Sequence, residues 1–407
     1  MPRIMNLARA TALPRGFRFA SVNCGLRKPP NLDLGLILCE GPAAAAGAFT
    51  QNLVQAAPVV LTRQHLRKAA SRIRAVIVNS RNANCATGPA GMNAALATAG
   101  EVARAIHCAP EQVLVSSTGV IGVPLRVERI LAAVPGLVQA ASHGAEAFDG
   151  FVHAIMTTDT RPKWAAAHCR LGGHTVRLLG CAKGAGMIHP NIATMLAYIV
   201  TDAAVRPRIL QRALGTVVPR TFNAITVDGD TSTNDTVLVL SSGQAGNRVI
   251  SGVDGNYRRF LAALEQVCHS LALQIVGDGE GASHVIEIEV RGAPSDRAAE
   301  QVARTIAGSP LVKTMFAGAD PNWGRILAAA GRSGVKFDPS RAEIYMGGLL
   351  VCRRGVEYPF SERQAHQRLL RDFIPVTVEL GAGRGRARMW TCDFTTDYVH
   401  INAGYRT

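Results

Sequence analysis

The sequence has few aromatic residues and no long hydrophobic run, and both shortages exclude classes of protein. Phe, Trp and Tyr together make up 5% of the 407 residues, so broad aromatic stacking surfaces are not expected. No apolar segment reaches the roughly 20 residues that a membrane-spanning helix needs. Residues 1–15 contain arginines and no acid but lack the apolar core of a secretory signal, although a short organellar transit peptide stays open. We therefore expect no membrane partner and a cytoplasmic location, or the mitochondrial matrix if the source is eukaryotic.

Metal-binding and redox motifs are also missing. The nine cysteines include no C-x-x-C pair, and the eleven histidines include no H-E-x-x-H pattern. Scattered cysteines are typical of reduced thiols in a cytosol-like compartment, and Cys85 and Cys181 are interpreted as small buried hydrophobic residues. We expect neither a metal ion nor a resident cofactor.

Acidic residues are scarce relative to basic ones. The chain has 29 Asp and Glu against 44 Lys and Arg, which gives a formal net charge of +15. Such a surplus is compatible with nucleic-acid binding, and a non-enzymatic basic binding protein is one hypothesis. The densest basic segment, residues 63–74, has no interleaved aromatic residues and no recognised reading motif, which favours the solvated face of a short helix. We expect no nucleic-acid partner, and a charge that solubilises the protein and attracts anionic substrates.

Hydrophobic residues are abundant, at 48%, and their spacing predicts an α/β fold. A chain of this length can bury a large core and form two structural units. Short β-rich apolar runs alternate with helical periodicity along the sequence. Strands are predicted over residues 34–39, 75–79, 113–116, 175–181, 195–201, 236–240, 284–290, 342–346, 376–380 and 388–393. Helices are predicted over residues 91–107, 125–134, 146–156, 257–276, 295–307 and 323–330, the second of them ended by Pro135.

A glycine-rich loop at residues 277–281 divides this pattern. The long helical pattern precedes it, and a new strand begins soon after it at residue 284. We place a domain boundary there. It separates a larger α/β domain of residues 1–280 from a smaller C-terminal α/β domain of residues 281–407. The larger domain contains the candidate nucleophile described below.

The most informative segment runs from Lys183 to Leu196. It reads KGAGMIHPNIATML, in which glycine and alanine allow tight backbone turns and Pro190 fixes one dihedral. Thr194 follows at the end of this constrained loop and directly before the apolar run 195–200. A hydroxyl held between a loop and a buried strand suits a nucleophile, and it also suits a chain that cuts itself between Ala193 and Thr194. The alternative is that Thr194 only begins a strand.

Short sequence blocks of distinctive composition recur along nearly the whole chain. They are PRGF at 14–17, AGAFT at 46–50, NSRNAN at 79–84, STGVIG at 117–122, MTTDT at 156–160, TVDGDTSTND at 226–235, DGEGA at 278–282, DPNWGR at 320–325 and INAGYRT at 401–407. Together with the segment 183–196, these blocks resemble the self-cleaving ornithine acetyltransferase (glutamate N-acetyltransferase) family. Each block alone is weak, and their number and order carry the resemblance.

The resemblance implies a fold and a processing event. The implied fold is a layered α-β-β-α sandwich of the self-processing threonine acyltransferase kind, with a second smaller α/β domain. The chain is expected to cleave itself into an alpha fragment, residues 1–193, and a beta fragment, residues 194–407. The fragments would stay associated, as a heterotetramer of two alpha and two beta chains.

Self-cleavage would solve a chemical problem at Thr194. An ordinary threonine hydroxyl needs an adjacent base, and no recognised His or Asp spacing supplies one. If the hydroxyl attacks the Ala193 carbonyl, the peptide bond becomes an ester, and hydrolysis then frees the Thr194 amine. An α-amine has a pKa of roughly 7.7–8.0, so part of it is neutral near pH 7 and can accept the hydroxyl proton. Nucleophile and base then belong to one residue.

Acyl transfer also needs donors for the developing oxyanion. Thr118 and Gly119 follow an apolar strand, and a tight turn there can present the Thr118 hydroxyl and the Gly119 N–H together. The resemblance assigns oxyanion stabilisation to this pair, and a polar turn or helix cap is the alternative.

The resemblance also implies a set of substrate contacts. They are Thr157, Lys183, Thr194, Glu280, Asn402 and Thr407. Among them, Lys183 supplies a cation near the nucleophile, and Glu280 supplies an anion for the side-chain amine of ornithine. A structural ion pair between Lys183 and Glu280 is the alternative.

Three further features of the site are expected alongside these contacts. Thr158 or Thr160 can hold the role given to Thr157. The two contacts near the end of the chain imply a C-terminus that folds back to the site. The polar stretch 228–235 is expected to pack close to the nucleophile, and it lacks the distal Glu that a calcium-binding EF-hand needs.

Five positions depart from the family pattern. Arg81 stands where glycine is usual, Ala185 and Ile192 where serine and methionine are common, Gly277 in place of a basic residue and Gly404 in place of an acid. These departures leave open the rate of self-cleavage and the preference for donor or acceptor.

The leading hypothesis is a ping-pong acetyltransferase of arginine biosynthesis. N2-Acetylornithine acetylates Thr194 and leaves as ornithine, and glutamate then takes the acetyl group to give N-acetylglutamate. Acetyl-CoA as a second acetyl donor stays open. The alternatives are a related self-processing amidase or aminopeptidase, which would pass the acyl group to water, and an acetyltransferase of specialised metabolism with another acceptor.

Overall fold

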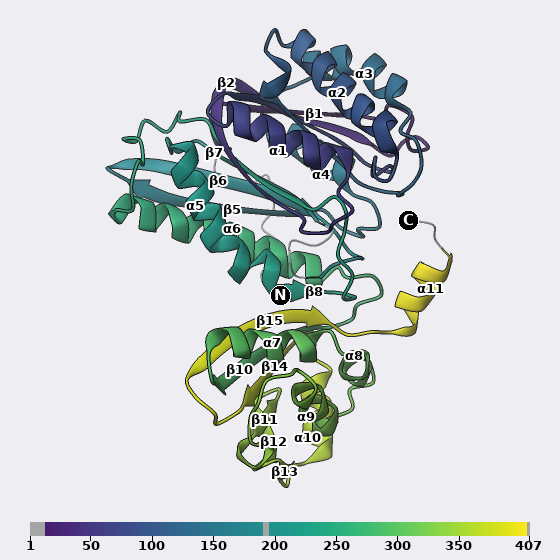
Figure 1. Cartoon of the computed structure of the whole chain (residues 1–407), viewed down its shortest axis with the longest axis vertical. Coiled ribbons are helices and arrows are strands. Elements are labelled where there is room, and N and C mark those ends of the chain that lie inside the picture. Colours follow the sequence, from purple (N-terminus) through teal and green to yellow (C-terminus); the bar gives the residue numbers. More distant parts are fainter. Residues whose placement is uncertain (1–12, 190–194, 405–407) are drawn as a thin grey trace.

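The larger of two β-sheets organises the first part of the chain (Figure 1). The computed structural model describes residues 13–189 and 195–404. Within them this sheet has eight strands in the order β4-β3-β2-β9-β7-β6-β5, with β1 paired to β2. The strands are β1 Phe17–Val22, β2 Leu34–Phe49, β3 Ile73–Asn79, β4 Val113–Ser117, β5 Lys163–Leu171, β6 His174–Lys183, β7 Leu196–Thr201 and β9 Thr236–Ser241.

Strand β2 joins the two halves of this sheet. Its first part pairs with β3, and its last six residues, 44–49, pair antiparallel with β9. Alternate side chains point to different cores, as the two-residue period of a strand requires. Tyr198 and Val200 of β7 share a core with Ile37 of β2, whereas Ile199 faces the opposite way. The two halves therefore face each other across one inner core.

Helices cover both outer faces of this double layer. One half is covered by α2 and α3, and the other by α5 and α6. Helix α1 packs on β4, and α4 packs on β1 and β2. The helices are α1 Ala57–Ala69, α2 Gly88–Ala105, α3 Val127–Gln139, α4 Ala145–Ile155, α5 Pro207–Val217 and α6 Gly255–Val276. The order helix, sheet, sheet, helix confirms the α-β-β-α sandwich expected from the sequence.

The second sheet is formed mainly by the C-terminal part of the chain, in the order β13-β12-β11-β14-β10-β15-β8. Its strands are β8 Ile225–Thr226, β10 Val285–Ala293, β11 Glu343–Met346, β12 Leu349–Arg353, β13 Val356–Glu357, β14 Phe373–Glu379 and β15 Gly385–Cys392. Its helices are α7 Asp296–Ala307, α8 Pro310–Ala317, α9 Trp323–Gly331 and α10 Glu362–Leu369. Trp390 of β15 contacts His269 of α6, with ring centroids 4.8 Å apart, so this sheet packs against the helix that covers one face of the larger sheet.

Helix α11, Thr396–Gly404, follows β15 and returns toward the larger sheet (Figure 1). It buries none of its residues, so polar contacts described below fix its position. No helix in the described ranges is both long and apolar enough to cross a bilayer.

Most of the strands and helices that periodicity predicts are present, with ends shifted by a few residues. The expectation that Pro135 ends a helix was wrong, because α3 continues to Gln139. Ile130, Val134 and Leu137 form one buried stripe that spans the proline. Packing of this stripe outweighs the single backbone hydrogen bond that proline cannot make.

The basic segment 63–74 also differs from the expectation of one short helix. Helix α1 ends at Ala69, and β3 begins at Ile73, so Arg74 lies in a strand. Most residues of β3 are buried, and several of them are β-branched. Because this burial favours a strand, the helix ends before β3 begins.

Candidate active site

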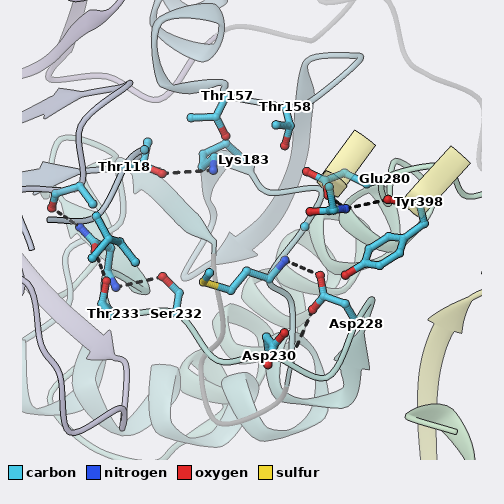
Figure 2. Close-up of a pocket in the computed structure, with 17 residues that line it drawn as sticks. Thr118, Thr157, Thr158, Lys183, Asp228, Asp230, Ser232, Thr233, Glu280 and Tyr398 are labelled. Carbon is cyan, nitrogen blue, oxygen red and sulfur yellow. Dashed lines mark hydrogen bonds between the residues drawn. The ribbon is translucent and has the colours of Figure 1, made fainter. Parts of the chain in front are cut away.

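A pocket opens where loops from the larger sheet meet helix α11 (Figure 2). Thr118 and Lys183 lie toward one side of it, and Glu280 and Tyr398 toward the other. The lining residues are Ala83, Thr118, Gly119, Ile121, Thr157, Thr158, Lys183, Gly186, Met187, Asp228, Asp230, Ser232, Thr233, Asn234, Glu280, Tyr398 and Asn402. The pocket therefore collects five of the predicted site residues that the structure describes, together with Gly119.

The turn after β4 presents two hydrogen-bond donors to the pocket. The Thr118 N–H donates to Asn79 O at 3.0 Å, which fixes the turn, and its hydroxyl faces the pocket. Gly119 has φ 132°, and a Cβ built on it would lie 2.1 Å from the Arg81 carbonyl carbon, so only glycine fits. The Gly119 N–H donates to none of the described residues. A hydroxyl and a backbone N–H beside a pocket are the kind of donors that an oxyanion-binding turn uses.

Lys183, at the end of β6, contacts this turn. Its Nζ donates to Thr118 Oγ1 at 3.2 Å, and the side chain is buried (Figure 2). Burial lowers the pKa of Lys183, against the opposing charge of Asp159. The hydrogen-bond partner of the Lys183 ammonium group is Thr118, and that of the Glu280 carboxylate is Asn402, so these contacts do not favour the alternative of a structural ion pair between them.

Glu280 lies at the other side, after the glycine-rich loop. Its N–H donates to Ala185 O at 2.9 Å, and its Oε2 accepts from Asn402 Nδ2 at 2.8 Å. A Cβ at Gly186 would lie 2.4 Å from Oε2, so the loop approaches Glu280 closely because it has no side chain there. Asn402 of α11 thus comes back to the pocket, whereas Thr407 lies outside the described residues.

A buried network of charges supports this arrangement, and sequence reasoning missed it. Asp159 accepts hydrogen bonds from Thr157 N at 2.9 Å, Gly184 N at 2.7 Å and Lys163 Nζ at 2.6 Å. Burial opposes ionisation of Asp159, but the Lys163 and Lys183 charges and these hydrogen bonds lower its pKa. Lys163 Nζ also contacts Asp278 Oδ2 at 2.5 Å, two residues before Glu280. One network therefore positions Thr157, Lys183 and Glu280 together.

The three threonines of the 157–160 loop have different positions. Thr157 and Thr158 line the pocket. Thr160 instead donates through its backbone and hydroxyl to Asp278. Thr160 is therefore engaged in the supporting network, and Thr157 and Thr158 are the two that can reach a ligand.

The polar stretch 228–235 forms one wall of the pocket. Five of its residues line the cavity. Asp228 accepts from Met187 N at 2.5 Å and from Ile188 N at 2.8 Å, and burial raises its pKa to about 6. Asp235 accepts from Met195 N at 2.9 Å. Two aspartates of this stretch therefore hold the chain on both sides of the segment 190–194.

Ala193 and Thr194, the expected cleavage pair, lie outside the described residues. Among the described side chains, no group of three or more His, Cys, Asp or Glu residues is arranged to hold a metal ion.

Fold and pocket define the class: a four-layered α/β protein whose pocket brings together a hydroxyl, a cation and a carboxylate. The ArgJ family model matches residues 18–407. A relative from Chlorobaculum tepidum, named arginine biosynthesis bifunctional protein ArgJ, is 47% identical over 394 residues, covering 97% of this chain and 96% of its own. The relative of the same name from Geobacter sulfurreducens is 48% identical over 397 residues, covering 97% and 99%. This chain belongs to the ArgJ family.

A solved structure agrees with this assignment. The crystal structure of arginine biosynthesis bifunctional protein ArgJ from Bacillus halodurans is 44% identical and superposes with a TM-score of 0.50. The match covers 51% of this chain and 98% of that one.

Proposed function

We propose that the chain is a glutamate N-acetyltransferase that moves an acetyl group from N2-acetylornithine to glutamate. Membership of the ArgJ family, whose relatives are named for arginine biosynthesis, supports this pathway. The observation that carries the chemistry is the turn at Thr118 and Gly119, whose two donors border a pocket that holds Glu280 on its far side. A substrate with an acylated amine and a cationic side chain fits that polarity.

In the first half-reaction the Thr194 oxygen attacks the acetyl carbonyl carbon of N2-acetylornithine. Negative charge develops on the carbonyl oxygen, and Thr118 Oγ1 and the Gly119 N–H donate to it. The free amine of Thr194 accepts the hydroxyl proton and returns it to the departing nitrogen, so ornithine leaves as a neutral amine that protonates in water. Glutamate then attacks the acetyl-threonine ester by the reverse sequence.

Electrostatics orient the substrate. Glu280 is buried beside Asn402 and offers its remaining acceptor capacity to the ammonium group of the ornithine side chain. Lys183 provides the cation that a substrate carboxylate needs. Thr157, held by Asp159, and Thr407 complete the set of contacts that the family resemblance assigns.

Self-cleavage between Ala193 and Thr194 is part of the proposal. It supplies the amine that serves as base and yields fragments of 193 and 214 residues (407 minus 193). The solved Bacillus halodurans chain is about half as long as this one, since 51% of 407 residues, about 208, makes up 98% of it. A chain of that length supports separate alpha and beta fragments.

The remaining parts of the proposal concern organisation. We place the boundary of the smaller domain at residue 281, so that the larger domain of residues 1–280 contains the nucleophile. The fragments assemble as two alpha and two beta chains in the cytoplasm, a location that the bacterial relatives support. The relatives are named bifunctional, which makes acetyl-CoA the second acetyl donor to test.

Intact-mass measurement after brief incubation with N2-acetylornithine tests the proposal. Two chains are expected, ending at Ala193 and beginning at Thr194, with one acetyl group added to the second. Thr194→Ala should stay uncut and inactive. A full-length chain that is active without ever being cut would overturn the mechanism.

Hydrolysis of the acyl-enzyme is the rival outcome. An amidase would release acetate at a similar rate with or without glutamate, whereas an acetyltransferase yields N-acetylglutamate in proportion to the ornithine released.

A further inference from the structure

Lys313, on helix α8 in the C-terminal part of the chain, is a charged residue that is only 1% exposed. Its Nζ donates to Thr391 Oγ1 at 2.9 Å and to the Cys392 carbonyl, and it lies 4.4 Å from the centre of the Phe394 ring. The Phe394 N–H also donates to the Lys313 carbonyl at 3.3 Å. These contacts join one lysine to the short segment, residues 391–394, that leads from β15 toward α11.

The contacts of the Lys313 ammonium group are with neutral groups: a hydroxyl, a carbonyl and an aromatic ring. Burying a charge is costly unless an opposite charge compensates it. Burial accordingly lowers the pKa of Lys313, and Cys392, Asp393 and Asp228 act in the opposite direction. A methionine would fill a similar space without this cost, so stability of the fold alone does not call for a lysine here.

The ring beside the ammonium group connects it to helix α11. Phe394 and Tyr398 are stacked, with ring centroids 4.6 Å apart and planes at 21°. Tyr398 lines the pocket on the side of Glu280 (Figure 2), and its carbonyl accepts from Asn402 Nδ2 at 3.0 Å. The same Nδ2 group donates to Glu280 Oε2 at 2.8 Å. A row of contacts thus runs from the buried ammonium group to the carboxylate proposed to bind the donor.

Helix α11 depends on such contacts because it buries none of its residues. A separate attachment lies just before it, where Thr395 Oγ1 donates to Gly281 O at 2.7 Å. A Cβ at Gly281 would lie 2.5 Å from Tyr398 N, so the helix approaches this glycine closely. The attachment keeps the start of α11 at the glycine-rich loop. The aromatic stack is then the contact through which Lys313 affects how the helix is oriented at the pocket.

We propose that Lys313 is a positioning residue for recognition of the donor; this inference rests on the proposed function. Its ammonium group fixes the Phe394 ring, as a cation beside the face of an aromatic ring does. The fixed ring holds Tyr398, and α11 then presents Asn402 to Glu280. Lys313 acts through these residues, and it keeps the acidic side of the pocket in the geometry that a cationic side chain requires.

Steady-state kinetics of Lys313→Met with two acetyl donors tests this role. KM for N2-acetylornithine should rise by about 10-fold, within the range of a desolvated cation–π contact. KM for N-acetylnorvaline, which has no side-chain amine, should change little. The midpoint of thermal unfolding should not fall, because a buried charge without a compensating partner is removed. A role in stability alone predicts the opposite result, a less stable protein with an unchanged ratio of the two KM values.

Phe394→Leu and Phe394→Tyr give an independent comparison that leaves the lysine in place. Leucine removes the aromatic face and should reproduce the rise in KM for N2-acetylornithine, whereas tyrosine keeps this face and should retain the wild-type value. Combining Lys313→Met with Phe394→Leu should raise KM little more than either change alone, since both act through one contact. This pair of variants also carries the test if Lys313→Met does not fold.

Lys336→Met is the matched control, because Lys336 is an exposed lysine in the same part of the chain. It should leave both KM values unchanged. Hydrogen exchange followed by mass spectrometry gives a readout that needs no activity. Amides of residues 396–404 should exchange about 10-fold faster in Lys313→Met than in Lys336→Met, because α11 loses a contact that orders it.

Three results would overturn the assignment: a folded Lys313→Met variant with the wild-type ratio of KM values, equal KM values for the two variants at residue 394, or unchanged exchange in α11. If α11 exchanges faster in Lys313→Met but the wild-type protein does not transfer acetyl from N2-acetylornithine to glutamate, the proposed function fails and the positioning of α11 by Lys313 stands. The two failures are therefore distinguishable.

Discussion

Lys183 Nζ donates a hydrogen bond to Thr118 Oγ1 at 3.2 Å and so ties the end of β6 to the turn after β4. A hydroxyl that accepts a hydrogen bond keeps its own proton for donation elsewhere. Lys183 therefore orients the Thr118 hydroxyl without using the proton that an oxyanion needs. The contact joins the cation of the site to its oxyanion-binding turn.

Removing this cation should weaken catalysis through Thr118. Lys183→Met is expected to lower kcat/KM by about 10- to 100-fold, the range of a hydrogen bond to a charged group. Thr118→Val should lower it as well. In a double-mutant cycle the two effects should be strongly non-additive, because both variants remove the same oriented donor. Additive effects would show that Lys183 acts independently of Thr118.

Gly119 should tolerate no side chain. Gly119→Ala places a Cβ 2.1 Å from the Arg81 carbonyl carbon at φ 132°, so the turn must open and the N–H must move. Loss of one oxyanion donor typically lowers kcat by about 10²–10³. Gly122→Ala is the control, since Gly122 has φ 78° but open space around its Cα. It should affect stability more than kcat, and equal losses of kcat in both variants would contradict the assignment.

Glu280 should discriminate substrates by side-chain charge. Glu280→Gln can keep the hydrogen bond from Asn402 but loses the negative charge. KM for N2-acetylornithine should rise by about 10-fold or more, as for a charge-assisted contact. KM for N-acetylnorvaline, which has no side-chain amine, should change little. Steady-state kinetics with both donors checks this, and a parallel rise for both would show a structural role only.

Local patterns predicted the layers better than the supporting contacts. The long helix α6 and the strands β3, β7 and β9 follow from periodicity because their buried faces repeat at fixed spacing. Strand β5, KWAAAHCRL, escaped prediction because its alanines give no strong alternation, and β6 determines its pairing. Tertiary contacts thus supplied what its own sequence does not encode.

The same limit applies to the site. Sequence reasoning identified five pocket residues because the family blocks marked their positions. They are Thr118, Gly119, Lys183, Glu280 and Asn402. The link from Lys163 to Asp278 joins residues that are 115 apart in the sequence, and no spacing rule connects them. Asp235 was visible as part of a polar block, but the hydrogen bond that it accepts from Met195 N exists only in the folded interior.

Asp228 should make stability fall as the pH rises. Its pKa is about 6 in the folded chain against an ordinary value of 3.8, so the folded state binds the proton more tightly. The contribution of Asp228 to stability is therefore greatest below about pH 4 and decreases as the pH rises to about 6, by about 3 kcal/mol at most. Asp228→Asn should lose this dependence. Chemical denaturation of both proteins between pH 4 and 7 checks the difference, and parallel curves would contradict it.

Arg81 should be a site at which glycine stabilises the fold. Its φ is 75°, in the left-handed region that favours glycine, and the family resemblance leads us to expect glycine there. Arg81→Gly is therefore expected to raise the free energy of unfolding by up to about 1 kcal/mol. Arg74→Gly, within β3, is the control. It should lower the free energy of unfolding by a similar amount, since glycine weakens the interior of a strand.

Because the Arg81 carbonyl accepts from Val120 N at 3.2 Å and borders Gly119, activity should be retained only if this backbone conformation persists. Thermal and denaturant unfolding of both variants checks this prediction, with kcat measured alongside. An Arg81→Gly variant less stable than the wild type would show that the side-chain contacts of Arg81 outweigh its backbone strain.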